Sequence, residues 1–143
     1  ILNEKKGPPP EINLLNEKNN GETILKLIEE GLIKSAHDVS LGGIITAVSK
    51  MAIKGKKGFK LNKLKVLINK FDYYFGEDQG RYIIEIEPKN LSKVQKILKD
   101  NSVHYDEIGL VTEKDIILDK EPIIHIDDLV KSNTNWLKEY MDK

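Results

Sequence analysis

SAHDVSLGGIITAVSKMAI, residues 35–53, is the most informative segment of the sequence, because two different structural patterns meet within it. The segment 33–39 is short and partly apolar and follows Gly31, a natural helix stop, so it predicts a strand. Beyond the glycine pair, apolar residues recur at helical spacing, which predicts a helix over about residues 41–54. The sequence therefore predicts a strand, a tight turn and a helix in direct succession.

The polar residues of this turn have the chemistry of a magnesium–phosphate site. Side chains alternate along a strand, so Asp38 and Ser40 are expected on one side and His37 on the other. The helix that begins at Gly42 and Gly43 offers unpaired N–H groups, and glycines let an anion come close to them. Because Mg²⁺ is commonly shared between one or two carboxylates and phosphate oxygens, Asp38 is the candidate metal ligand.

A purely structural interpretation of the same turn stays open at this point. Ser40 would cap the helix, Asp38 would brace the turn, and His37 would be a hydrogen-bonded core histidine. Residue spacing alone does not separate this alternative from a ligand site.

A second polar cluster, FGEDQGRY, occupies residues 75–82 at the entry to the clearest predicted strand. A carboxylate beside Arg81 could hold a phosphate or close an interface. The alternative is a solvated loop with a local ion pair.

Two other polar features are interpreted as structural. The lysine-rich segment 54–60 lacks the spacing of a phosphate-binding loop and is interpreted as a charged turn. His104 and His125 have no partner at metal-ligand spacing and are interpreted as structural.

The remaining pattern predicts an α+β protein with a mixed β-sheet packed with helices. Residues 1–15 form an extended proline-rich lead-in, either a linker or a strap across a neighbouring domain, and residues 16–143 form a single domain. Further helices are expected over 16–30, 91–98 and 127–141, the last with Asp127 as its N-cap. Further strands are expected over 59–61, 64–68, 81–87, 105–111, 115–118 and 123–125.

Composition narrows the classes of function. The 143 residues include 23 basic and 23 acidic side chains, and this balance argues against a nucleic-acid partner. With no cysteine, a disulfide framework, a thiolate zinc site and a cysteine nucleophile are all excluded. No apolar run is long enough for a membrane span or a signal peptide. The chain begins with isoleucine, and we therefore expect a fragment or a processed piece.

Five segments carry a resemblance to a known family. PPPEINLLNEKNNGE (8–22), SAHDVSLGGIITAVSKMAI, YYFGEDQGRYIIEI (73–86), IGLVTEKDIIL (108–118) and WLKEYM (136–141) occur in the order seen near the carboxyl end of formylglycinamide ribonucleotide amidotransferases. The resemblance covers essentially the whole chain. It implies the carboxyl-terminal domain of the aminoimidazole ribonucleotide synthetase superfamily, a three-layer α/β/α sandwich.

The family resemblance also implies an activity. These cytoplasmic ligases use ATP and glutamine-derived ammonia to convert formylglycinamide ribonucleotide to the amidine in purine biosynthesis. The implied partners are the upstream synthetase domains, a glutaminase subunit and a small accessory subunit. The family's catalytic groups lie upstream, so we expect no catalytic residue here and an inactive fragment, with a homodimer as one form that it could take.

The resemblance assigns Asp38 and Ser40 to a second, non-turnover site for Mg²⁺ and ATP or ADP, beside the backbone of Gly42 and Gly43. Leu41 departs from the family pattern, which commonly has an acidic or small polar residue there. Two alternatives follow: a structural or interaction domain with a vestigial nucleotide site, which Leu41 favours, or another superfamily member, such as thiamin monophosphate kinase, selenophosphate synthetase or a hydrogenase maturation protein. The second cluster argues against the latter.

Overall fold

The computed structural model describes residues 11–62, 69–119 and 121–142. The predicted strand over 64–68 and most of the proline-rich lead-in lie outside these ranges. The elements in chain order are α1 (Leu14–Glu29), β1 (Ser35–Asp38), α2 (Gly43–Gly55), β2 (Gly58–Leu61), α3 (Lys70–Phe75), β3 (Tyr82–Glu85), the 3₁₀ turn η1 (Pro88–Asn90), α4 (Leu91–Asp100), β4 (Gly109–Thr112), β5 (Asp115–Ile117), β6 (Ile124–His125) and α5 (Ile126–Met141).

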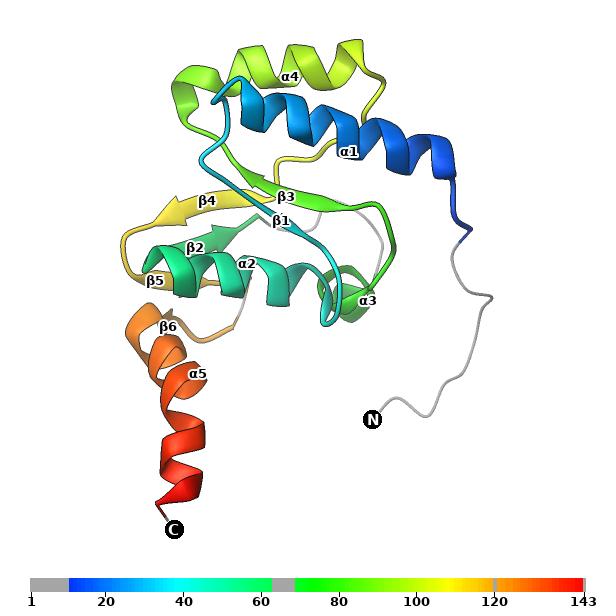
Figure 1. Cartoon of the computed structure of the whole chain (residues 1–143). Coiled ribbons are helices and arrows are strands. Elements are labelled where there is room, and N and C mark those ends of the chain that lie inside the picture. The colour runs from blue at the N-terminus through cyan, green and yellow to red at the C-terminus, as the bar shows by residue number, and fades with distance from the viewer. Residues whose placement is uncertain (1–10, 63–68, 120, 143) are drawn as a thin grey trace.

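The strands confirm the α+β class and divide into two sheets. Strand β1 pairs antiparallel with β3, in a register that runs from Ser35 opposite Glu85 to Asp38 opposite Tyr82. The second sheet has the order β4-β2-β5-β6 and is mixed, because β2 runs antiparallel to β4 and parallel to β5. Figure 1 shows α1 and α4 above the β1–β3 pair, α2 in front of the second sheet and α5 below it.

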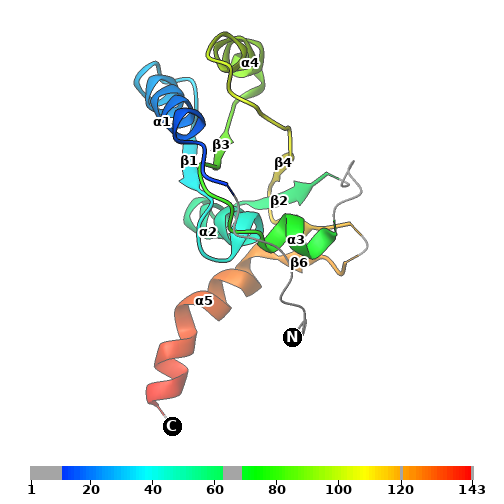
Figure 2. The ribbon, with the colours of Figure 1, turned by 90° about the vertical axis from the view of Figure 1, so that its right-hand side faces the viewer.

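Helices cover both faces of the β1–β3 pair, which gives the expected α/β/α layering. On β3, Ile84 packs into a core with Leu27 of α1 and Val94 of α4, and both of these helix residues are fully buried. The next residue back, Ile83, points to the other core, which α2 covers. This alternation is the period of two that a strand requires when both of its faces are buried. In Figure 2, α1 and α4 lie above the strand pair and α2 lies below it.

Helix α2 carries the apolar stripe that the sequence predicts. Ile44, Ala47, Val48 and Ala52 are buried against the second sheet, where they meet Phe59 and other core residues. The helix includes Gly55 as its last residue. The left-handed residue beyond it is Lys56, with φ of 51°, so the predicted stop at Gly55 falls one residue early.

Several predicted boundaries are wrong. Helix α3 is absent from the sequence prediction, and the predicted strand over 105–111 is the shorter β4. The N-cap of α5 is His125 rather than Asp127, because the His125 ring nitrogen accepts the Asp127 N–H at 3.4 Å. Asp127 instead lies in the first turn, where its carboxylate accepts from Lys114 at 3.0 Å and complements the helix dipole.

Candidate functional site

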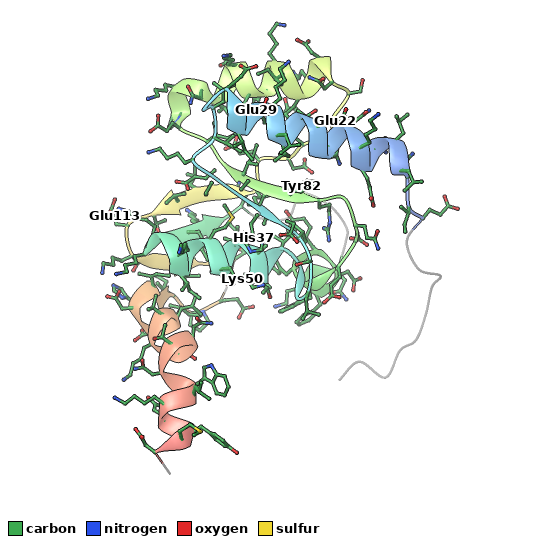
Figure 3. The ribbon with its side chains drawn as sticks, in the orientation of Figure 1. Glu22, Glu29, His37, Lys50, Tyr82 and Glu113 are labelled. Atoms are coloured by element: carbon green, nitrogen blue, oxygen red, sulfur yellow. The ribbon has the colours of Figure 1, made fainter. Side chains whose placement is uncertain are left out.

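The turn between β1 and α2 presents Asp38 and Ser40 to solvent. Both residues are exposed while Val39 between them is buried, as the predicted alternation requires. The Asp38 side chain is 64% exposed, and its carboxylate lies 3.4 Å from the His37 ring. His37 lies on the other face of β1, toward α2, and is labelled in Figure 3. One carboxylate and one hydroxyl are therefore accessible to solvent at the end of β1.

The start of α2 is already occupied by a side chain from a distant segment. The Gly42 N–H donates to Glu77 Oε1 at 2.8 Å, although the two residues are 35 positions apart. The Gly43 N–H donates to the Ser40 carbonyl oxygen at 2.9 Å. The N-cap residue of α2 is Gly42, and its amide is bound by the Glu77 carboxylate rather than by the Ser40 hydroxyl, so the proposed capping role of Ser40 is wrong. A carboxylate at this end of the helix is favourable because it meets the positive end of the dipole.

Packing explains the glycine pair without any ligand. Gly42 and Gly43 have φ of 83° and 69°, a region that residues with a Cβ rarely adopt. A Cβ on Gly43 would lie 2.6 Å from the Tyr74 carbonyl oxygen and 2.7 Å from the Phe75 backbone. The glycine therefore lets α2 approach the end of α3 closely. The sequence prediction had assigned the glycine pair to anion access instead.

The second polar cluster forms a loop that Arg81 holds in shape. The Arg81 guanidinium donates to the Gly76 carbonyl oxygen at 2.6 Å and lies 3.1 Å from Asp78 Oδ2. The local ion pair expected under the structural interpretation is therefore present. These bonds fix the loop on both sides of Glu77, whose carboxylate points at the Gly42 amide.

Strand pairing brings the two polar clusters together. Asp38 is opposite Tyr82, and the Val39 N–H donates to the Arg81 carbonyl oxygen at 2.9 Å. The sequence singled out both clusters but gave no sign that Glu77 contacts Gly42. That contact depends on the register of β1 with β3, which no local pattern reveals.

The site has few groups that could hold a metal ion. Within residues 11–62, 69–119 and 121–142, no cluster of three or more histidine or carboxylate side chains could hold an ion by itself. One exposed carboxylate and one hydroxyl fit a Mg²⁺ that takes most of its ligands from phosphate and water. They do not fit a cation held by protein groups alone.

Among residues 11–62, 69–119 and 121–142, none of the helices has the length and apolar character of a membrane-spanning segment.

This fold and turn define a class of domain, and a family model supports it. The model described as "AIR synthase related protein, C-terminal domain" matches residues 1–119. The chain belongs to this family.

Within that class, the chain is similar to one kind of enzyme subunit. It is 68% identical over 142 residues to "Phosphoribosylformylglycinamidine synthase subunit PurL" of Pelagibacter ubique (strain HTCC1062), covering 99% of this chain and 20% of the relative. The sequence resemblance to this family is thereby confirmed. The chain spans about a fifth of the length of the curated relatives it matches.

Solved structures agree with the fold. "Structure of PurLQS from Thermotoga maritima" matches with a TM-score of 0.72 at 21% identity, covering 85% of this chain and 22% of that one. "T. maritima PurL complexed with ADP" matches with a TM-score of 0.70 at 22% identity, covering 84% of this chain and 22% of that one. At this identity, the likeness shows the fold alone.

Proposed function

We propose that this chain is the carboxyl-terminal domain of the ATP-dependent ligase that converts formylglycinamide ribonucleotide and ammonia to the amidine in purine biosynthesis. The observation that carries the proposal is the 68% identity with PurL over 142 residues. The domain contributes shape and a nucleotide-contacting turn, and it does not catalyse the reaction by itself. Its partners are the remaining synthetase domains and, as the PurLQS complex suggests, glutaminase and accessory subunits.

A chimera tests the ligase assignment. This chain replaces the matched 142 residues of the P. ubique PurL, and amidine and ADP formation are measured with formylglycinamide ribonucleotide, ATP and ammonium chloride. Ammonium removes the need for a glutaminase. We expect activity within about tenfold of the parent enzyme and none from PurL that lacks the segment. An inactive chimera that is folded by circular dichroism would refute the assignment.

The exposed side chains support a nucleotide at the turn through a cation. Asp38 would hold Mg²⁺, Ser40 would donate to a phosphate oxygen, and the ion would offset the negative charge of the phosphates. The Gly42 amide reaches a phosphate only if the Glu77 carboxylate leaves it, because Glu77 accepts that N–H at 2.8 Å. The metal therefore provides the main attraction for an anion at this turn.

A second candidate is a structural domain whose turn binds no nucleotide. The Glu77 contact favours it, since a fixed carboxylate both fills the helix start and repels phosphate. Leu41 favours it as well, because this apolar side chain is 79% exposed where the family commonly has a polar one. Calorimetry separates the two candidates, because only a nucleotide site predicts Mg²⁺-dependent ADP binding that Asp38→Ala weakens.

A further inference from the structure

Helix α5 has one apolar stripe, of which only the first half is used within the domain. At about 100° per residue, its apolar side chains fall within an arc of about 140°, and the opposite side is polar. Ile126 is fully buried at the start of the stripe, and Leu129 and Val130 pack against the same core. The continuation of the stripe is exposed: Trp136 is 61% accessible, Leu137 53%, Tyr140 71% and Met141 73%.

The exposed half projects beyond the body of the domain. Figures 1 and 2 show α5 leaving the second sheet and ending far from every other labelled element. A groove of about 430 Å³ lies at its base, between α5 and α2, with Ile45, Phe75 and Trp136 among its lining residues. Trp136 thus connects the groove to the free end of the stripe. The groove and the four exposed side chains together are named here the α5 face.

The exposed side chains of the α5 face are extensive enough for a contact between domains. With aromatic side chains of roughly 150–250 Å² each, its four exposed side chains present on the order of 500 Å². A partner that covers this area gives an interface of about 1,000 Å² in total. That is a common size for contacts between domains of one polypeptide, about 600–1,500 Å².

Two comparisons point to the same occupant. Helix α5 lies outside residues 1–119, which the family model matches. The P. ubique relative matches 142 of the 143 residues and is about five times as long as this chain. The relative therefore has ample further polypeptide that could cover such a face.

We infer that the α5 face docks onto an apolar surface of the remaining synthetase polypeptide, in the longer protein of which this chain forms one domain. This inference rests on the proposed function, because it takes the rest of a PurL-type protein as the partner. It adds the surface that makes the contact. A second copy of the chain is the competing occupant.

Fluorine NMR tests the inference directly, because Trp136 is the single tryptophan of the chain. The chain is labelled with 5-fluorotryptophan and titrated with the unlabelled remainder of the P. ubique PurL, the part outside the matched segment. We expect the single resonance to shift and saturate. Leu137→Asp should weaken this binding at least tenfold, whereas Asn135→Asp, the same change on the polar side of α5, should leave it unchanged.

Three other outcomes of the titration overturn the inference. No shift at about 1 mM remainder, a concentration typical of tethered domains, would show that the α5 face does not dock there. Equal binding by the two variants would place the contact elsewhere. If the resonance shifts as the concentration of the chain alone is raised, and this shift is absent in Leu137→Asp, the α5 face binds a second copy of the chain. A failed ligase chimera with the expected NMR result would refute the enzyme assignment and leave the docking contact standing.

Discussion

The β1–α2 turn and the far end of α5 are opposite kinds of surface. The turn is polar, and the Val39, Gly42 and Gly43 amides all donate hydrogen bonds within the domain, Gly42 to the Glu77 carboxylate. The end of α5 is apolar and packs against nothing among the described residues beyond the groove at its base. A motif that stands out in the sequence can therefore be stabilised mainly by hydrogen bonds within its own domain. A helix that does not stand out can expose the larger apolar surface.

The largest effect is expected from a substitution that breaks the turn. Gly43→Ala places a Cβ 2.6 Å from the Tyr74 carbonyl oxygen, at φ of 69°. Backbone strain and overpacking together should lower the free energy of unfolding by about 3 kcal/mol or more. The matched control is Gly55→Ala in the same helix, where a Cβ meets nothing within 4 Å. Urea unfolding of both variants should separate them clearly, and equal stabilities would contradict the close approach of α2 and α3.

A smaller effect is expected when the bond across the two polar clusters is removed. Glu77→Ala leaves the Gly42 amide without its acceptor and should cost about 1 kcal/mol in urea unfolding, as the loss of a helix cap does. Glu77→Gln keeps an acceptor oxygen and should recover part of that loss. A destabilisation shared equally by both variants would mean that the charge rather than the hydrogen bond matters.

The acid sensitivity of the strand pair that positions the turn is a further, smaller test. Hydrogen bonds from Lys34 and Lys89 lower the pKa of Glu87 from 4.5 to about 2. Because the folded pKa is depressed, this stabilisation is present above pH 4.5 and is lost as the pH falls toward about 2. Glu87→Gln should therefore be less stable than wild type at neutral pH and equal to it near pH 2. A difference in melting temperature between the two proteins that stays constant across this pH range would contradict the ion pairs.

The smallest effect is expected at the free end of α5. Leu137 is 53% exposed, so Leu137→Ala should change the unfolding free energy of the chain by no more than about 0.5 kcal/mol. Leu27→Ala, at a fully buried position, should cost about 2–5 kcal/mol in the same urea titration. A large loss at Leu137 would show that the α5 face is already packed within the domain.

Local patterns were enough to predict the strand–turn–helix at residues 33–54 and the helix stop at Gly31, whose φ is 63°. They also predicted the shared exposure of Asp38 and Ser40, since strand alternation is a local property. They failed at α3, because six residues give too little periodicity for a helix to be recognised. They failed at the N-cap of α5. Aspartate is preferred over histidine at an N-cap, but it is the His125 ring nitrogen that lies in position to accept the Asp127 N–H.

The assembly of the site could not be predicted for a different reason. Glu77 reaches Gly42 only after β1 and β3 pair in one register, and Gly43 is required by the approach of α3. Both are contacts between segments about 30 or more residues apart. The role of the site residues in nucleotide binding stays a prediction.

Calorimetry is the most direct test of the claim that this turn takes a magnesium nucleotide. ADP is titrated into the wild-type chain, Asp38→Ala and the control Asp106→Ala, an exposed carboxylate on another segment, with and without Mg²⁺. The account predicts binding that requires Mg²⁺, is weakened at least tenfold by Asp38→Ala and is unchanged by Asp106→Ala. Equal affinity in all three proteins, or no heat from any of them, would contradict it and leave the turn a structural element.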